Sequence, residues 1–131
     1  MSERFVLITG ASRGLGKVLS WRFAKEGYGL CLVAQEEKRL NELSIELKQQ
    51  FKNEIQFISC DLGNSMDIDV LINKTRQKIP RLDVLINNAA IQGAIGPLWE
   101  NDLDSWKKVI NVNLIGPVSY THLTLPTKRI V

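Results

Sequence analysis

Short apolar runs and amphipathic segments alternate four times along this chain of 131 residues. The apolar runs are typical of strands buried on both faces, and the segments between them repeat their apolar residues at helical spacing. Such alternation predicts an α/β fold, with parallel strands joined by right-handed crossovers and helices on both faces of a doubly wound sheet. The expected strands are residues 4–9, 30–34, 55–60 and a fourth from residue 83, and the expected helices are residues 14–25, 37–52, 65–79 and 104–114.

Two helices carry apolar stripes that should face the sheet. In the first, Val18, Leu19, Arg22 and Phe23 recur at helical spacing; in the second, the stripe is made of Leu40, Leu43, Leu47 and Phe51. The charge-rich remainder of the second helix is expected to be its solvated face.

Composition favours a single globular domain and excludes several classes of protein. The hydrophobic share of 44% is ordinary, and no apolar run is long enough to span a bilayer. The first residues lack the pattern of a secretory leader, so a cytoplasmic location without membrane contact is expected. The formal net charge is +3, and without Lys128 and Arg129 it is nearly zero, which gives no support for a nucleic-acid partner.

The two cysteines, Cys31 and Cys60, lie inside apolar runs without CxxC spacing or a neighbouring histidine cluster. We expect them to be reduced thiols of the core, and we expect no metal site.

A glycine-rich stretch, "TGASRGLG" at residues 9–16, joins the first strand to the first helix. A helix start presents unpaired N–H groups and the positive end of its dipole, which suit a diphosphate. Gly10 can make the sharp turn, Gly14 can allow the backbone to approach phosphates, and Gly16 can let the helix pack closely on the sheet. A phosphate loop of the nucleotidase type is disfavoured because Ala11 and Val18 stand where that motif needs glycine and Ser or Thr. A purely structural tight turn is the alternative.

Three further motifs follow in order: "CDL" at residues 60–62, "NNAA" at 87–90 and "NVNLIG" at 111–116. Together with the glycine-rich stretch they resemble the short-chain dehydrogenase/reductase family from Phe5 to Gly116. The resemblance implies a Rossmann-like sheet of strand order 3-2-1-4-5-6-7 and hydride transfer between a nicotinamide cofactor and a carbonyl or alcohol of a small-molecule substrate.

The same resemblance implies a set of cofactor contacts. The glycine-rich turn would hold the pyrophosphate, the aspartate-leucine pair would lie beside the adenine, and the motif ending the fourth strand would border the ribose. In this family the last residue of that motif is usually glycine, so Ala90 adds a methyl group that we expect to be tolerated. The expected contacts are Gly10, Ser12, Arg13, Gly14, Leu15, Gly16, Gln35, Asp61, Leu62, Asn88, Ala89 and Ala90.

The choice between NADP and NAD depends on the end of the second strand. An acidic residue there would bind the ribose 2′-hydroxyl of NAD, but this sequence has Ala34 and Gln35. Arg13 could pair with a 2′-phosphate through its planar guanidinium, so NADP is favoured. The nearby Glu36 keeps NAD possible.

Catalysis in the family uses a serine, a tyrosine, a lysine four residues after it, and an asparagine that supports a proton-relay water. Only the asparagine can be placed, as Asn113; a structural role in the helix backbone is its alternative. Tyr120 is followed by Thr124 where a lysine would be needed, and the histidine in "YTHL" is expected to be incidental. We therefore expect these 131 residues to be inactive by themselves, and a non-enzymatic nucleotide-binding or regulatory module is the second hypothesis. Homo-oligomer formation by the full-length protein stays open.

The last segment, "VSYTHLTLPT" at residues 118–127, resembles a translated transposon adapter from sequencing-library preparation. On this interpretation residues 1–117 are the N-terminal part of a dinucleotide-binding domain and residues 118–131 are a non-native tail. The fourth strand would then lie at an edge of the sheet, where unpaired backbone groups invite association.

Overall fold

The alternation predicted from the hydrophobic pattern is present in the computed structural model, which describes residues 4–79, 81–91, 97–100, 102–121 and 129–130. Most element bounds agree with the expected ones within two residues. The elements are β1 (Phe5–Thr9), α1 (Gly14–Lys25), β2 (Gly29–Ala34), α2 (Glu37–Gln50), β3 (Ile55–Ser59), α3 (Ser65–Lys78), β4 (Val84–Ile86), the 3-10 turn η1 (Leu98–Glu100), α4 (Leu103–Ile110), the π-helical turn η2 (Asn111–Ile115), α5 (Gly116–Tyr120) and β5 (Arg129–Ile130).

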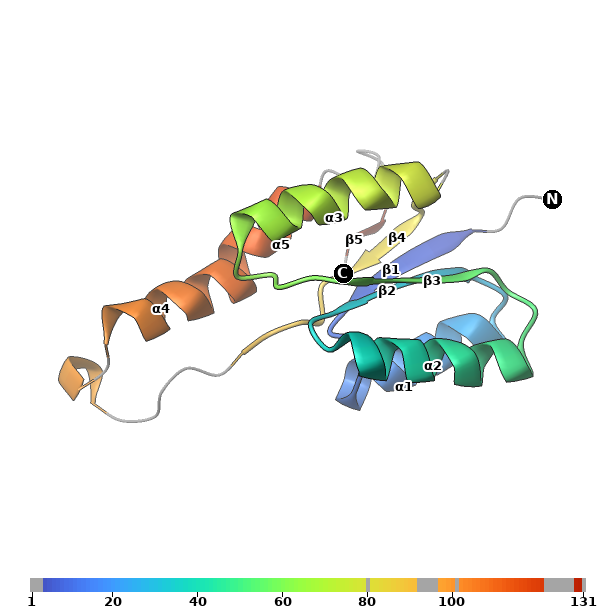
Figure 1. Ribbon diagram of the computed structural model, residues 1–131, viewed down its shortest axis with the longest axis horizontal. Helices are drawn as coiled ribbons and strands as arrows, with labels where there is room; N and C mark the ends of the chain where they lie inside the picture. Colours follow the sequence, from blue (N-terminus) through green and yellow to red (C-terminus); the bar gives the residue numbers. More distant parts are fainter. Residues whose placement is uncertain (1–3, 80, 92–96, 101, 122–128, 131) are drawn as a thin grey trace.

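The strands form one parallel sheet in the order β3-β2-β1-β4-β5. Helices α1 and α2 cover one face of this sheet, and α3 and α5 cover the other (Figure 1). This arrangement confirms the doubly wound, Rossmann-like α/β fold.

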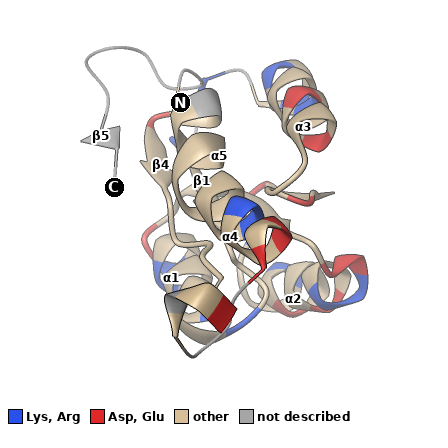
Figure 2. Cartoon of the chain, turned by 90° about the vertical axis from the view of Figure 1, so that its left-hand side faces the viewer, with Lys and Arg blue, Asp and Glu red and all other residues tan. Residues whose placement is uncertain are grey.

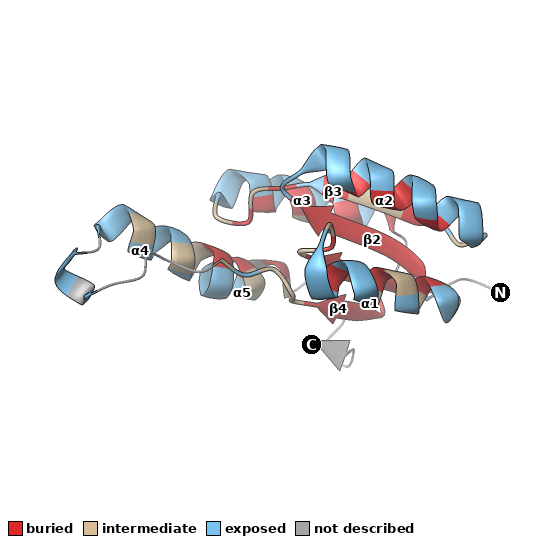
Figure 3. Ribbon diagram, turned by 90° about the horizontal axis from the view of Figure 1, so that it is seen from below, coloured by how far each residue is buried: buried red, intermediate tan, exposed pale blue. Residues whose placement is uncertain are grey.

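Two apolar cores lie on the two faces of the sheet, because successive side chains of a strand point to opposite faces. Val6 and Ile8 of β1 belong to the core that contains the α2 stripe, whereas Leu7 belongs to the core under α3 and α5. The strands are accordingly buried while the outer faces of the helices are exposed (Figure 3). Leu40, Leu43 and Leu47 are buried as predicted, with Phe51 packed at their margin.

The packed face of α1 differs from the expected stripe. The buried residues are Gly16, Ser20 and Ala24, spaced four apart, and Val18 is 64% exposed. Leu19 and Phe23 are partly buried beside this face, and Arg22 is exposed. Small residues let α1 approach the sheet closely, so the larger apolar side chains are displaced to its flanks.

The edge position predicted for β4 is wrong in this structure. Residues Arg129–Ile130 form β5, which pairs in parallel with Val84 and Leu85. The expected boundary after residue 117 falls inside α5, and Tyr120 of that helix is fully buried in the core under α3. Leu123 and Leu125, whose alternation in the tail resembles that of a strand, lie outside the described residues. The adapter origin of residues 118–131 stays a prediction, which resequencing the gene from its source DNA would test.

The fourth expected helix is interrupted. It begins at Leu103, where the Asp102 side chain accepts a hydrogen bond from the Ser105 N–H, and it widens into the π-helical turn at Asn111. The N–H of Gly116 bonds to the carbonyl of Asn111, five residues earlier. Pro117 has no N–H to donate to the carbonyl of Asn113, so regular α-helical bonding fails at this place.

Charged residues of both signs lie side by side on α2 and α3 (Figure 2), in keeping with a nearly neutral body. Both cysteines are buried and free, as predicted. Among the helices in the described part of the chain, none combines the length and the apolar character that a bilayer crossing requires.

Candidate functional site

A cavity of about 310 Å³ lies where the first four strands end. Parallel strands bring their carboxyl ends to one edge of the sheet, and ligands of doubly wound proteins bind at that edge. Most of the cofactor contacts predicted from the sequence line this cavity: Gly10, Ser12, Arg13, Gln35, Asp61, Leu62, Asn88, Ala89 and Ala90.

Three predicted contacts, Gly14, Leu15 and Gly16, do not line the cavity, nor does Asn113. Leu15 is 65% exposed on the first turn of α1, beyond the cavity wall. Six lining residues were not predicted as contacts: Ala34, Glu36, Cys60, Ile91, Lys108 and Val112. Two of these come from α4 and η2, and the register of those helices on the sheet cannot be read from helical periodicity.

The glycine-rich turn needs glycine for two different reasons. Gly10 and Gly14 have positive φ angles of 65° and 58°, a conformation that other residues rarely adopt. Gly16 is required by packing, because a Cβ there would collide with the carbonyl oxygen of Gly10 and lie 2.7 Å from Nδ2 of Asn88. A Cβ at Gly14 would meet no atom of the protein within 4 Å. The space above Gly14 is therefore open to a ligand.

A hydrogen-bonded clamp fixes this turn to the segment after β4. The N–H groups of Asn88 and Ala89 donate to Oγ1 of Thr9 over 3.1 and 3.0 Å, and Nδ2 of Asn88 donates to the carbonyl of Gly10 over 3.2 Å. The Asn88 side chain was expected to border the ribose of the cofactor. In the structure it holds the glycine-rich turn through its hydrogen bond to Gly10. Thr9 was missed as a functional residue because its effect depends on a neighbour distant in sequence.

The N-terminus of α1 is left open on the side of the glycine-rich turn. Its N-cap residue, Arg13, makes no side-chain capping bond, and its first turn holds no acidic residue. The first N–H groups of a helix have no intrahelical acceptor, and they carry the positive end of the helix dipole. This end of α1 therefore suits an anion.

The wall formed by β3 carries a carboxylate in a fixed orientation. Oδ1 of Asp61 accepts a hydrogen bond from the N–H of Gly63, and the Asp61 N–H donates to Oδ2 of Asp67. Leu62 beside it is buried. Cys60 also lines the wall, where burial raises the pKa of its thiol to about 12, so the thiol stays protonated at neutral pH.

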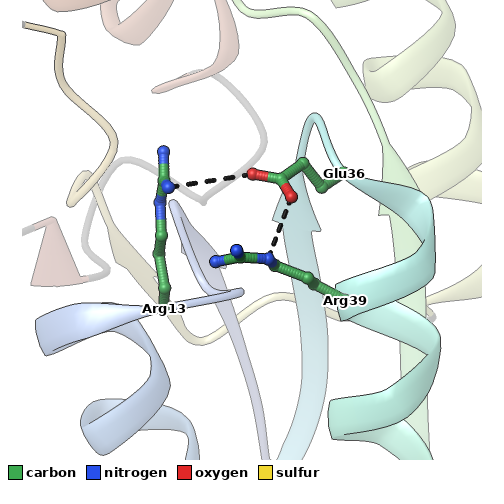
Figure 4. A network of polar contacts seen from close by, with 3 residues as sticks. All are labelled: Arg13, Glu36 and Arg39. Atoms are coloured by element: carbon green, nitrogen blue, oxygen red, sulfur yellow. Dashed lines mark ion pairs between the residues drawn. The ribbon is translucent and has the colours of Figure 1, made fainter.

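Three charged side chains meet at the rim between α1 and α2 (Figure 4). Oε1 of Glu36 lies 3.9 Å from the guanidinium of Arg13, and Oε2 lies 2.9 Å from Nε of Arg39. Arg13 and Glu36 were expected near the 2′ position of the cofactor, whereas Arg39, which stands one helical turn into α2, was not predicted.

Asn113 lies in the π-helical turn and is linked to the segment after β4. Its Oδ1 accepts from the N–H of Ile91 over 2.9 Å, and its Nδ2 donates to the carbonyl of Ile91 over 3.0 Å. The side-chain amide is thus engaged with the backbone of another segment and not with its own helix. Its assignment to a proton-relay water stays a prediction.

Comparisons with known proteins agree with this geometry. The model of the short chain dehydrogenase family matches residues 4–129. Sulfoacetaldehyde reductase 2 of Chromohalobacter salexigens is 35% identical over 93% of this chain and 48% of its own length. A short chain dehydrogenase/reductase, dpmpG, of Macrophomina phaseolina is 33% identical over 95% of this chain and 71% of its own length.

Among solved structures, a metagenomic short-chain oxidoreductase in complex with NADP superposes with a TM-score of 0.88 at 29% identity, over 95% of this chain and 55% of the other. This chain spans about half the length of that structure and of the sulfoacetaldehyde reductase. The family match over residues 4–129, together with the cavity at the strand ends, shows that the chain belongs to the short chain dehydrogenase family.

Proposed function

We propose that this chain supplies the cofactor-binding half of an NADP-preferring oxidoreductase that acts on a carbonyl or alcohol. The observation that carries the proposal is the cavity at the strand ends, bordered by the glycine-rich turn and the open N-terminus of α1. The related metagenomic oxidoreductase binds NADP, which supports the same assignment here.

The residues present fit the adenosine and diphosphate part of such a cofactor. Space is open above Gly14, and no carboxylate of the first turn of α1 would repel a diphosphate. The cavity volume is at the small end of the range for ligand pockets, which suits part of a dinucleotide better than the whole. The bound cofactor would accept or donate the hydride, and this chain would hold and orient it.

Each wall of the cavity has a role in this proposal. The first-turn N–H groups of α1 and the Ser12 hydroxyl bind the diphosphate. Asp61 accepts a hydrogen bond from the adenine amino group, and Leu62 packs beside the ring. The backbone of Ala89 and Ala90 borders the ribose, and Gln35 lies at the 2′ position. Arg13 binds the 2′-phosphate through a charge-assisted pair.

Asn113 is proposed to serve the reaction indirectly in this chain. By binding both backbone groups of Ile91 it holds the end of the segment in which Ala89 and Ala90 are proposed to border the ribose. Pro117 cannot donate a hydrogen bond to the backbone carbonyl of Asn113, and this carbonyl is the acceptor that we propose for a proton-relay water. The sequence contains no tyrosine followed by lysine four residues later, so we propose that these 131 residues bind cofactor without turnover.

Calorimetric titration of the chain with NADPH and NADH tests the proposal. We expect both to bind, NADPH more tightly, and no oxidation of either in the presence of carbonyl compounds. Asn64→Ala is a control outside the cavity that should bind normally. Failure of the chain to bind either nucleotide would overturn the proposal.

The preference for NADP has its own test. Arg13→Ala should lower the affinity for NADPH more than that for NADH, by about tenfold for one charge-assisted contact. An unchanged ratio of the two affinities would refute the role given to Arg13.

A further inference from the structure

A second pocket, of about 390 Å³, lies at the amino edge of the sheet, where β1 and β2 start and α1 ends. This edge is opposite the one that holds the cavity at the strand ends (Figure 1). The pocket, called here the amino-edge pocket, is lined by Arg4, Arg22, Phe23, Glu26 and Tyr28. None of these residues lines the cavity at the strand ends, so the amino-edge pocket is separate from the proposed nucleotide site.

Two aromatic rings give the amino-edge pocket an apolar wall. Phe23 and Tyr28 meet edge to face, with their ring centroids 5.0 Å apart, and both pack against the core that α1 and α2 share. The N–H of Tyr28 also donates a hydrogen bond to the carbonyl of Phe23, which fixes the chain between them. A planar aromatic ligand can therefore pack on a surface that is already formed.

Arg4 places a guanidinium group beside these rings. Its Cζ lies 4.8 Å from the centroid of the Tyr28 ring, a cation–π contact. Within the described ranges, Arg4 forms no ion pair with a carboxylate. A guanidinium has five N–H donors, and the contact with the ring positions the group without supplying an acceptor of the strength of a carboxylate. These donors are therefore available to an anion.

The second guanidinium group, that of Arg22, is paired with Glu26 one helical turn further along α1. The shortest distance between their charged atoms is 3.1 Å. The two side chains are 68% and 52% exposed, and solvent screens ion pairs of this kind. A carboxylate that enters the amino-edge pocket can therefore take Arg22 from Glu26. The lining residues carry two positive charges against one negative charge, which favours an anion over a cation.

The end of α1 leaves few free carbonyl groups to repel such an anion. The last carbonyls of a helix carry the negative end of its dipole. Here the carbonyls of Arg22, Phe23 and Ala24 each accept a hydrogen bond from a backbone N–H that follows the helix. Nδ2 of Asn53 also donates to the carbonyl of Ala24, and the last turn contains Lys25 as well as Arg22. The charge that a ligand meets is therefore set by the side chains.

We propose that the amino-edge pocket binds a small aromatic carboxylate. The guanidinium groups of Arg4 and Arg22 hold the carboxylate by charge-assisted hydrogen bonds, and the ligand ring packs on Phe23 and Tyr28. Glu26 weakens this binding, because it competes with the ligand for Arg22. The volume of the pocket is within the range of small-molecule sites. This site is additional to the proposed function and does not depend on nucleotide binding.

An amide-resolved NMR titration of the whole chain with benzoate tests the proposal. We expect saturable shifts at the amides of Phe23, Glu26 and Tyr28, with a dissociation constant of about 1 mM for a ligand of this size. Benzyl alcohol has the ring without the charge and acetate has the charge without the ring, so each should bind at least about tenfold more weakly. Acetate binding as tightly as benzoate would overturn the proposal. Benzoate shifts confined to Gly14 and Leu15, at the other end of α1, would overturn it as well.

Two substitutions should change benzoate affinity in opposite directions. Arg4→Gln removes the unpaired guanidinium group and should weaken binding about tenfold. Glu26→Gln removes the competing carboxylate and should strengthen binding about threefold. Arg76→Gln removes an exposed arginine from the last turn of α3 and is the matched control, which should stay within about twofold of the wild type.

The affinity changes are compared at equal stability, since Arg4, Glu26 and Arg76 are all exposed and their variants should keep the unfolding midpoint of the wild type. Unchanged benzoate affinity in Arg4→Gln, or weaker binding in Glu26→Gln, would overturn the proposal. NADPH affinity should be the same in all three variants. If the wild type bound benzoate in the amino-edge pocket but bound neither NADPH nor NADH, only the proposed function would fail.

Discussion

Helices α1 and α3 both begin at the carboxyl edge of the sheet, but they treat their first N–H groups in opposite ways. The side chain of Asn64 caps α3 by accepting hydrogen bonds from the N–H groups of Met66 and Asp67, and Asp67 adds a negative charge to the first turn. Helix α1 begins at Arg13 with neither device. The protein thus satisfies one helix start internally and leaves the other without a side-chain cap, which suits the anionic ligand proposed for it.

Among the substitutions that test this difference between the N-termini of α1 and α3, the largest effect is expected at Gly16. Gly16→Ala brings a methyl group against the carbonyl of Gly10, a backbone atom that cannot move without the turn. We expect a loss of about 2 kcal/mol in the free energy of unfolding and loss of nucleotide binding. Denaturant titration and calorimetry would measure the two effects.

Gly63, in the turn before α3, provides the matched control for Gly16. A Cβ there would lie 3.1 Å from a methyl group of Val112, a side chain that can adjust. The other close neighbour of such a Cβ is Oδ1 of Asp61, at 3.3 Å. Gly63→Ala should therefore cost less than about 1 kcal/mol and weaken nucleotide binding much less than Gly16→Ala does. Equal behaviour of the two variants would contradict the special role of the α1 turn.

Arg13→Asp would make the start of α1 resemble that of α3. The new carboxylate could cap the helix and would repel a diphosphate, so affinity for NADPH should fall about 100-fold, while the free energy of unfolding should rise by up to about 1 kcal/mol. Calorimetry and thermal unfolding together would show the opposed changes. A variant that gains no stability and still binds would mean that the N-terminus of α1 does not form the anion site.

The reverse change, removal of the side-chain cap of α3, is expected to have a smaller effect. Asn64→Ala removes the acceptor for two N–H groups and should lower the free energy of unfolding by about 1 kcal/mol. Because α3 starts away from the glycine-rich turn, NADPH affinity should not change. If calorimetry showed weaker binding at equal folded fraction, the α3 cap would have to belong to the site as well.

The smallest effect is expected at the Tyr120 hydroxyl, a buried polar group whose lack of a hydrogen-bond partner serves no ligand. The Tyr120 hydroxyl approaches Oγ1 of Thr9. That oxygen already forms hydrogen bonds with backbone groups of Ile86, Asn88 and Ala89. Among the described residues, the Tyr120 hydroxyl therefore makes no well-formed hydrogen bond. Tyr120→Phe should therefore change the free energy of unfolding by less than about 0.5 kcal/mol at neutral pH. A loss much above that in denaturant titration would reveal a partner of the hydroxyl.

Alkaline pH should separate Tyr120→Phe from the wild type. Burial raises the pKa of Tyr120 from 10.0 to about 12, so the unfolded chain releases this proton first and stability falls as the pH rises above 10. The variant lacks this contribution and should lose less stability between pH 10 and 12. Parallel denaturant titrations across that range would detect the difference, and identical slopes would contradict the assigned burial effect.

The order of the first four strands was predicted from the family resemblance, whereas local pattern was sufficient to predict the layers and most element bounds. Each of these depends on periodicity within one segment, as in the buried leucines of α2. The resemblance added the residues at the strand ends, most of which do line the cavity.

What could not be predicted depends on contacts between segments. The clamp between Thr9 and Asn88 and the link between Asn113 and Ile91 join residues that no local pattern relates. The π-helical turn had a signal, Pro117 four residues after Asn113, but its register required the packed structure. The small-residue face of α1 was missed because close helix packing reverses the usual inward preference of large apolar side chains.

The clamp between Thr9 and Asn88 would also make the proposed nucleotide affinity a measure of how completely the chain has folded. These residues are 79 positions apart, so the glycine-rich turn acquires its shape only after the segment following β4 has docked. A partly folded chain with β1 and α1 already formed would then lack affinity, and cofactor present during synthesis or refolding would stabilise the finished sheet by mass action.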